Sequence, residues 1–280
     1  MTYSLVARDP ETGELGVAVQ SRSFRTGSVV PWAAAGVGAV ATQSFSLRSY
    51  GPKGLALLGE GASPEEVLST LTGQDELRDF RQVGVVDALG RTAAYTGAAC
   101  IPAAGSTFGD GYSAQGNMLA SENVVPALAA GFETATGTLA ERLLGALEAA
   151  EAAGGDFRGR EAGAILVVGG DADDPNADSP LSDLRVDSHP DPLGELRRLL
   201  NLEQALRSLR RADVARLDEA VAEARAAGAD DDVIRWVAAV GQIADDPERA
   251  REWIAPLAAA DDRWTIALDR ASSMLEQTRG

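Results

Sequence analysis

The sequence predicts an α+β fold: a four-layer αββα sandwich of two mostly antiparallel sheets over residues 1–193, followed by a small all-α module over 194–280. Short β-type runs follow one another in pairs, which favours antiparallel pairing over the strict strand-helix alternation of a dinucleotide-binding fold. Helical stretches separate the groups of strands, so two facing sheets with helices outside accommodate the order. Of the 30 glycines only four, at 194, 228, 241 and 280, lie beyond residue 193. This change in composition indicates a domain boundary there.

Seven runs predict the strands of the first domain. Residues 2–8 and 15–21 flank Pro10-Glu11-Thr12-Gly13, whose proline and glycine suit a turn, so they are expected to form a hairpin. A second hairpin is expected around 88–90. The remaining strands follow from short apolar or alternating runs. The expected strands are 2–8, 15–21, 37–43, 81–87, 91–96, a weaker 111–115, and 164–168.

Capping signals predict the helices of the same domain. Ser63-Pro64-Glu65-Glu66 combines a capping serine, a proline at the first helical position and a glutamate at the third, and Gly73 can end this helix. Thr138 to Glu141 forms a second capping box for a helix over 139–153, which Gly154-Gly155 stops. A further helix is expected near 123–135.

The tail from about residue 195 is predicted to be helical throughout. Apolar residues recur there at helical spacing in five groups, and Pro247 and Pro256 are expected to separate the later helices. Three of the four tryptophans lie in this tail. Tryptophans at such positions usually form the core between packed helices, so a helical module is expected.

Composition excludes several classes of function. The chain has 42 acidic and 25 basic residues and a net charge of −17, which would repel the phosphates of nucleic acids. One cysteine, Cys100, excludes an intrachain disulfide framework, and no apolar run approaches the roughly 20 residues of a membrane helix. Arg8 and Asp9 lie where a signal peptide would need apolar residues. We therefore expect a cytoplasmic protein with neither a nucleic-acid nor a membrane partner.

Metal and cofactor sites are not expected. His189 is the only histidine, which disfavours a Ser-His-Asp triad or a two-histidine metal site, and it is expected to anchor a turn. The acidic stretch 171–178 lacks the glycine and final glutamate of an EF-hand, so a solvated hairpin loop is expected. No glycine-rich phosphate loop precedes a helix. We expect no metal and no nucleotide cofactor.

Seven stretches of residues 1–193 appear in the same order as in a known family. The sequence resembles the uncharacterised DUF1028 proteins and, more distantly, the N-terminal nucleophile (Ntn) hydrolases typified by proteasome β subunits. The distant similarity rests on the opening hairpin, on Gly116-Asn117 where that family has a Gly-Ser turn, and on Asp156 after the fourth helix. The seven stretches are TYSLVARDPETGELGVAVQSR, GVGAVATQ, RQVGVVD, TGAAC, GYSAQGNML, GGDFRGRE and LRVDSHPDP.

The resemblance implies that Thr2 is the catalytic nucleophile. Its small side chain would let methionine aminopeptidase remove Met1, leaving a free α-amino group with a pKa of about 7.7–8.0 beside the hydroxyl that it would activate. Such a pair attacks an amide carbonyl and forms an acyl-enzyme that water then releases. Ser4 is a weaker alternative nucleophile, and the competing interpretation is that Thr2 only starts an edge strand. Amide hydrolysis of a small molecule or peptide is the implied reaction.

The remaining candidate residues would assist that reaction. Asp156 resembles the aspartate that orients the terminal amine, with a loop aspartate paired to Arg158 as the alternative. Asn117 and the backbone at Gly116 could donate to an oxyanion, although an ordinary strand-to-helix turn fits them equally. Gln43 could contact substrate or orient Thr2, with a satisfied polar residue at a strand end as the alternative. Further polar candidates for substrate binding are Ser21 and Arg81, with Asp9 and Arg22 behind them.

Two departures from the Ntn pattern motivate a second hypothesis. The only lysine, Lys53, does not lie on an early strand, and Ala162 occupies a position where the resemblance leads us to expect serine. The alternative function is a non-catalytic binding protein. Its helical tail is similar in placement to an extension of some relatives described as peptidoglycan-binding, so a cell-wall fragment or a protein partner is the implied ligand. A homodimer is expected in either case.

Overall fold

The computed structural model describes residues 2–278 and divides into two compact units. The first unit ends at Arg197 and the second begins at Arg198, so the division falls within helix α5 (Pro192–Arg211). The first unit contains all the strands of the described residues, and the second is helical.

Six strands form the larger sheet of the first unit, called sheet A here. Their order is β10-β9-β2-β1-β8-β7, and every neighbouring pair is antiparallel. Strand β1 therefore lies inside the sheet, between β2 and β8. The bounds are β1 (Thr2–Arg8), β2 (Leu15–Ser21), β7 (Gly105–Gly109), β8 (Tyr112–Asn117), β9 (Ala162–Val168) and β10 (Ser182–Val186).

Four strands form the smaller sheet, called sheet B, in the order β3-β4-β5-β6. All its neighbouring pairs are antiparallel as well, and the register places Gln43 opposite Gln82 and Ser44 opposite Arg81. The bounds are β3 (Pro31–Ala34), β4 (Gly38–Ser44), β5 (Arg81–Asp87) and β6 (Thr92–Thr96).

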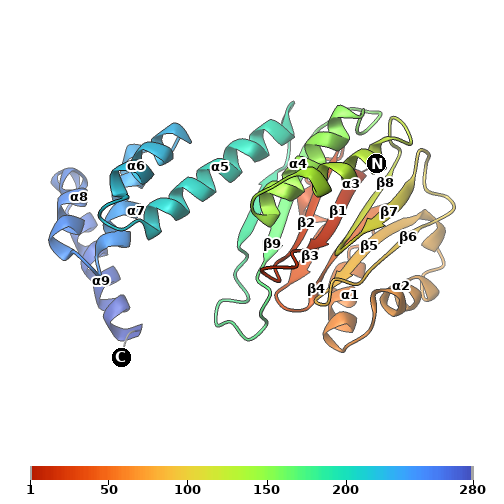
Figure 1. Cartoon of the computed structure of the whole chain (residues 1–280), viewed down its shortest axis with the longest axis horizontal. Helices are drawn as coiled ribbons and strands as arrows, with labels where there is room; N and C mark the ends of the chain where they lie inside the picture. Colours follow the sequence, from red (N-terminus) through yellow and green to blue (C-terminus); the bar gives the residue numbers. More distant parts are fainter. Residues whose placement is uncertain (1, 279–280) are drawn as a thin grey trace. The chain divides into compact units, whose positions relative to one another are not determined.

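Helices cover the outer face of each sheet (Figure 1). Helices α3 (Val124–Thr134) and α4 (Leu139–Ala152) pack on sheet A, and α1 (Tyr50–Gly59) and α2 (Pro64–Gly73) pack on sheet B. The capping boxes at Ser63 and Thr138 are both formed. The sheets face each other through β1 with β4 and β5 with β8. The predicted α+β sandwich of two antiparallel sheets, with a helical C-terminal region, is confirmed.

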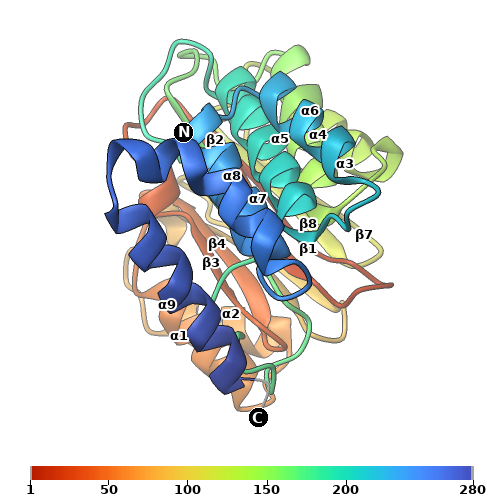
Figure 2. The same cartoon turned by 90° about the vertical axis from the view of Figure 1, so that its left-hand side faces the viewer.

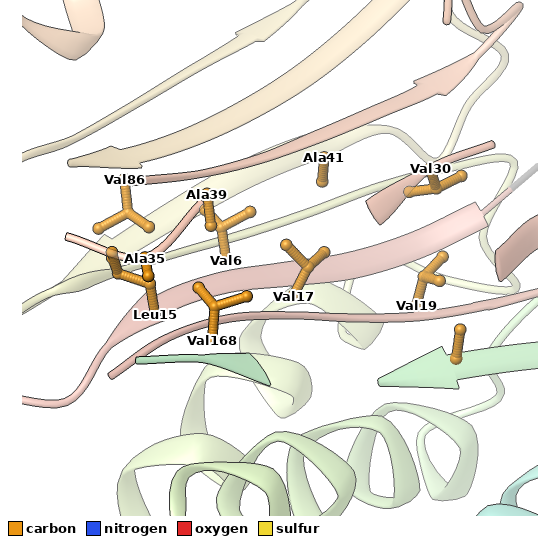
Figure 3. Close-up of a cluster of buried hydrophobic side chains, with 11 residues drawn as sticks. Val6, Leu15, Val17, Val19, Val30, Ala35, Ala39, Ala41, Val86 and Val168 are labelled. Atoms are coloured by element: carbon orange, nitrogen blue, oxygen red, sulfur yellow. The ribbon is translucent and has the colours of Figure 1, made fainter. Parts of the chain in front are cut away.

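An apolar core fills one part of the space between the sheets (Figure 3). Alternate residues of each strand face it, as the two-residue period of a strand requires, and sheet B contributes Ala39, Ala41 and Val86. Burying one such valine or leucine contributes about 1.5–3 kcal/mol to folding. The members from sheet A are Val6, Leu15, Val17, Val19, Ala164 and Val168, with Val30 and Ala35 from the loops that flank β3.

Four elements of the first unit have no range predicted from the sequence: β3, α1, β7 and β10. Helix α1 begins Tyr50-Gly51-Pro52-Lys53-Gly54, and two glycines with a proline are typical of a loop. Packing explains the glycines, because a Cβ on Gly51 would lie 2.2 Å from Cγ of Trp32, and one on Gly54 would lie 3.2 Å from Val40. Tertiary contact with sheet B therefore overrides the weak helix propensity of this segment.

The second unit consists of the larger part of α5 and four further helices (Figure 2). Pro256 does not separate two helices as expected but lies inside α8. Two apolar clusters hold the helices together, one including Leu209, Leu217 and Ile234, the other including Ile243 and Ile254. No helix of residues 2–278 is long and apolar enough to cross a membrane. The bounds are α6 (Leu217–Ala226), α7 (Asp231–Gln242), α8 (Pro247–Ala260) and α9 (Arg263–Thr278).

The close approach of α1 to β3 gives a stability prediction. Gly51→Ala should lower the free energy of unfolding by about 1–3 kcal/mol, because the new methyl group would overlap the ring of Trp32. Gly59→Ala in the same helix is the matched control, since its Cβ would meet only Val37 at 3.9 Å. The control should be neutral or stabilising by up to about 1 kcal/mol. Urea unfolding measures both, and equal effects would contradict the packing argument.

Candidate functional site

Thr2 lies at the start of a central strand, at the end of the sandwich where several other strands terminate. In sheet A, β1 pairs Thr2 with Asn117, the last residue of β8, and β2 ends nearby at Ser21. In sheet B, β4 ends and β5 begins at the same end, because Gln43 of β4 contacts the carbonyl of Thr2. Thr2 is thus not on an edge strand, and its side chain is only 5 % exposed.

The hydroxyl of Thr2 is held against β2. Its Oγ1 donates to Oγ of Ser21 at 3.2 Å, and the Ser21 Oγ also accepts from the backbone N–H of Ser23 at 3.0 Å. The register of β2 with β9 places Ala162 opposite Ser21, so no hydroxyl is available at the position where serine was expected. Ser21 is therefore the side-chain hydroxyl partner of Thr2 in the described structure.

Eight buried polar residues, called the polar cluster here, fill the space between the sheets beside the apolar core. Each has its side chain on the inner face of its strand, and none is more than 5 % exposed. Buried polar groups need hydrogen-bond partners, since an unpaired one costs about 1–3 kcal/mol. The members are Thr2, Ser4, Ser21, Gln43, Gln82, Ser113, Gln115 and Asn117.

Gln82 is the centre of this cluster and connects the two sheets. Its Oε1 accepts from Nε2 of Gln43 at 2.8 Å and from Nδ2 of Asn117 at 2.9 Å. Its Nε2 contacts Oγ1 of Thr96 at 2.9 Å and the carbonyls of Gly116 and Gly105 at 2.8 and 3.2 Å. One side chain from sheet B therefore binds two strands of sheet A.

A second set of hydrogen bonds connects β1 with β8. Nε2 of Gln115 donates to Oγ of Ser4 at 2.7 Å, and Oγ of Ser113 donates to Oε1 of Gln115 at 2.9 Å. Gly84 of sheet B lies over this amide, and a Cβ there would be 2.3 Å from Oε1 of Gln115. Ser4, the alternative nucleophile, is thus a buried structural acceptor.

Gln43 and Asn117 each have hydrogen-bonding groups that their bonds to Gln82 do not use. Nε2 of Gln43 makes longer contacts of 3.4 Å with the carbonyls of Thr2 and Gln115, while its buried Oε1 has no hydrogen-bond partner among the described residues. The Nδ2 of Asn117 has two hydrogens, and the bond to Gln82 uses one of them. Both amides therefore lie next to the start of β1 with buried groups whose hydrogen-bonding capacity is not fully used.

The predicted Gly116-Asn117 turn is instead the end of strand β8. Gly116 and Asn117 both pair with β1, and the chain turns at Met118, which has a φ of 53°. A Cβ on Gly116 would lie 2.8 Å from Leu119, so close packing accounts for this glycine. The backbone carbonyl of Gly116 already accepts from Gln82.

Asp156 organises the loops around Ser21. Its side chain is inaccessible to solvent. One oxygen accepts from the backbone N–H of Arg22 at 2.9 Å, and the other accepts from that of Arg158 at 2.8 Å. The guanidinium of Arg158 also donates to this carboxylate, with its Nη2 3.2 Å from Oδ2 of Asp156. This carboxylate fixes the end of β2, which carries the Ser21 hydroxyl against Thr2.

Arg81, a candidate for substrate binding, is engaged within the protein. Its Nε donates to Asp75 at 2.8 Å, and its Nη1 donates to the carbonyl of Phe45. The hydrogen bond from Arg81 holds the pKa of Asp75 below its ordinary value. Asp75 also accepts from the hydroxyl of Tyr50 at 2.9 Å. Arg81 thus ties the start of β5 to the segment between α2 and β5.

Tyr3 faces the opposite side of sheet A from Thr2, as alternation requires. Its hydroxyl donates to Glu151 of α4 at 2.8 Å. Burial, and then the charge of Glu151, raises the pKa of Tyr3 well above its ordinary value. Tyr3 therefore stays protonated and fixes the strand that carries Thr2 to the helix beneath.

The other sequence candidates lie apart from this cluster. His189 is exposed, and its Nδ1 accepts from the N–H of Asp191 at 3.0 Å within a turn. The acidic stretch 171–178 is the exposed connection between β9 and β10. Asp9 pairs with Arg142 at 3.2 Å, and Arg22 pairs with Glu161 at 2.9 Å. Residues 2–278 contain no group of three or more histidines, cysteines or acids that could hold a metal.

Gln82 and Gln115 are the site residues that sequence reasoning missed. The signal was present in the alternation of their strands, because Gln82, Gly84 and Val86 share one face of β5, and Ser113, Gln115 and Asn117 share one face of β8. Polar residues on an inward face indicate a buried network. Which residues meet across the two sheets, however, depends on tertiary packing.

The role of Gln82 can be tested against a second buried glutamine. Gln82→Met should lower the free energy of unfolding by about 2–4 kcal/mol, because it leaves the amides of Gln43 and Asn117 and the carbonyl of Gly116 without their partners. Gln20→Met is the control: Gln20 is equally buried, yet neither of its amide atoms has a described partner. The control should be neutral or stabilising. If urea unfolding gave the same loss of unfolding free energy for both variants, the hydrogen bonds of Gln82 would not account for its contribution to stability.

The Asp75–Arg81 pair predicts a pH-dependent contribution to stability. Because the folded pKa of Asp75 is lowered, its contribution is fully present above the unfolded pKa, about 3.9, and is lost as the pH falls through the folded pKa. Asp75→Asn should cost about 1 kcal/mol near pH 7, with the two unfolding curves converging below about pH 4. Asp183→Asn, which breaks the exposed pair with Arg185, should cost less than about 0.5 kcal/mol. A loss independent of pH would contradict this account.

Comparison with known proteins shows to which family the first unit is similar. A family model described as a family of unknown function, DUF1028, matches residues 2–196. The crystal structure of protein SPO2555 from Silicibacter pomeroyi, described with the same family, is 34 % identical, with a TM-score of 0.66 over 76 % of this chain and 88 % of that chain. No curated protein was found to match the chain. The chain belongs to the DUF1028 family.

Proposed function

We propose that the first unit is an Ntn-type amidohydrolase that uses Thr2 as its N-terminal nucleophile. The observation that carries the proposal is the position of the Thr2 hydroxyl. It lies at the start of a central strand, at the end of a buried polar cluster and 3.2 Å from Oγ of Ser21. An ordinary strand start does not need seven other buried polar residues in the same cluster. The proposal requires removal of Met1, for which Thr2 is small enough.

The proposed reaction begins with transfer of the Thr2 hydroxyl proton to its own α-amine. Oγ1 attacks the carbonyl carbon of an amide, and the carbonyl electrons move to oxygen to give a tetrahedral oxyanion. As the oxyanion collapses, the carbon–nitrogen bond breaks and the leaving amine takes the proton from the α-ammonium. Water, activated by the same amine, then hydrolyses the Thr2 ester and releases a carboxylic acid.

The neighbours of Thr2 have defined parts in this proposal. The second hydrogen of the Asn117 amide is the donor for the oxyanion, since Gln82 takes the first. Ser21 orients the Thr2 hydroxyl, and Asp156 acts through Ser21 by fixing the end of β2. Gln43 is a substrate contact through its unpartnered Oε1. Asp156 is thus a positioning residue rather than a direct partner of the amine.

Exposed aromatic residues around this end of the sandwich favour a substrate with apolar groups. Phe45 and Phe80 meet edge to face at 5.7 Å beside the ends of β4 and β5, and both are exposed. Phe24 follows β2 and Phe157 follows Asp156, and their loops are joined by the hydrogen bond from Arg22 to Asp156. We propose a small amide or peptide substrate and, with the single cysteine Cys100 buried and free, a cytoplasmic enzyme.

One observation favours the alternative, a non-catalytic binding protein. Ala162 lies opposite Ser21, so the hydroxyl that could assist the terminal amine is missing. In this alternative the polar cluster is structural, and a cell-wall fragment or protein partner is bound elsewhere on the chain. The two functions differ in whether Thr2 reacts with an electrophile.

Covalent labelling distinguishes them. Untagged protein incubated with an alkyl β-lactone should gain one acyl adduct, because the Thr2 hydroxyl opens the ring. Thr2→Ala should not be labelled, while Ser4→Ala should be, since Ser4 lies on the same face of β1 and is bound by Gln115. Mass spectrometry of the intact proteins and of their N-terminal peptides measures this. Equal labelling of wild type and Thr2→Ala, or an adduct at another residue, would refute the threonine mechanism.

A further inference from the structure

The second unit contains a cavity that the proposed amide chemistry does not use. It lies between α7 and α8, has a volume of about 290 Å³, and is lined by Arg235, Arg249, Glu252 and Trp253. Arg235 comes from α7 and the other three residues come from α8. This volume is close to the lower limit of small-molecule sites, about 300 Å³. The cavity is largely open to solvent, so a compact ligand can enter it.

The two arginines of this cavity have no carboxylate partner in the described structure. Both are half-buried, and neither takes part in an ion pair within 4 Å, although Glu252 lines the same cavity. Their neighbours differ, because Arg225, Arg251 and Arg263 pair with Asp231, Asp269 and Asp261. Because both arginines line the same cavity, two positive charges without a carboxylate partner lie close together there. Their guanidinium donors are available to an anion.

Trp253 supplies a fixed apolar surface beside these donors. Its side chain packs against both apolar clusters of the second unit. The indole is half-buried, and its N–H donates to no residue between 2 and 278. A ring held in this way can contact the organic part of a ligand while its N–H adds one more donor.

We propose that this cavity binds an organic monocarboxylate, with the carboxylate between Arg235 and Arg249 and the organic group on the indole of Trp253. Arginine matches a carboxylate with two parallel hydrogen bonds. The charges of the lining residues sum to +1, two arginines against Glu252, which suits one negative charge and disfavours a phosphate dianion. The carboxylate can belong to a free aromatic acid or to the C-terminus of a short peptide, since both present the same group.

The test is calorimetric titration of the full chain with four probes. Phenylacetate represents a free acid, N-acetyl-alanyl-phenylalanine a peptide terminus, the corresponding peptide amide a neutral analogue, and inorganic phosphate a dianion. We expect at least one of the two carboxylates to bind saturably, and the amide and phosphate to bind at least about tenfold more weakly. The tighter of the two acids identifies the source of the carboxylate.

Variants locate the binding site. Arg235→Gln and Arg249→Gln should each weaken carboxylate binding by about tenfold or more. Arg251→Gln is the matched control on α8, because that arginine is exposed and paired with Asp269, and it should bind as the wild type does. Glu252→Gln should strengthen carboxylate binding and admit phosphate, since it removes the opposing charge. Circular dichroism confirms that each variant is folded.

Three outcomes would overturn the proposal. They are absence of saturable binding by both acids, equal affinity for the peptide acid and its amide, and unchanged binding by both Arg235→Gln and Arg249→Gln. The increase in affinity predicted for Glu252→Gln cannot arise from misfolding. Titration in the Thr2→Ala background removes any hydrolysis of the two peptide probes, so a failure of carboxylate binding is distinguishable from a failure of the amidohydrolase proposal.

Discussion

The architecture of the candidate site depends on the hydrogen bonds of the Gln82 side-chain amide. It is fully buried between two sheets, where each unpaired polar group would cost about 1–3 kcal/mol. It accepts from one amide of each sheet and donates to the carbonyl of Gly116. The two sheets therefore cannot slide past each other at this end without breaking several buried hydrogen bonds. The apolar core beside it includes Val6, Val17 and Ala41. Its burial stabilises the sandwich, but hydrophobic contacts have no direction and so do not fix the position of one sheet relative to the other.

This constraint positions Thr2 through neighbouring residues. Asn117 is opposite Thr2 in the register of β1 with β8, and Gln82 fixes Asn117. On the other side of β1, Ser21 contacts the Thr2 hydroxyl, and Asp156 fixes the loop that follows Ser21. Thr2 is thus held from both neighbouring strands. A nucleophile gains from such preorganisation, because its geometry is established before substrate arrives.

Local signals allowed most of the first unit to be predicted from the sequence. The hairpin of β1 and β2 and the capping boxes at Ser63 and Thr138 depend on residues close in the chain. Helix α1 was missed because Gly51 and Gly54 serve contacts with Trp32 and Val40, which no local pattern reveals. Pro256 is predicted to separate two helices, yet it lies inside α8, where Ile254 and Leu257 on either side of it are buried.

The candidate site was only partly predictable, for a related reason. Thr2, Ser21, Gln43 and Asn117 were candidates by residue type and by resemblance, and the structure brings them together at one end of the sandwich. Gln82 joins them only because β5 of one sheet faces β8 of the other. The guanidinium of Arg81, a candidate on the same reasoning, is instead engaged by Asp75. Sequence alone gave the residue types but not these partners.

Thr2 can act as an N-terminal nucleophile only after removal of Met1, and the mass of the intact untagged protein tests this most directly. We expect a mass lower by one methionine residue, with Thr2 as the first residue of the N-terminal peptide. A protein that retains Met1 has no free α-amine on Thr2, and this result would contradict the proposed mechanism and favour the binding function.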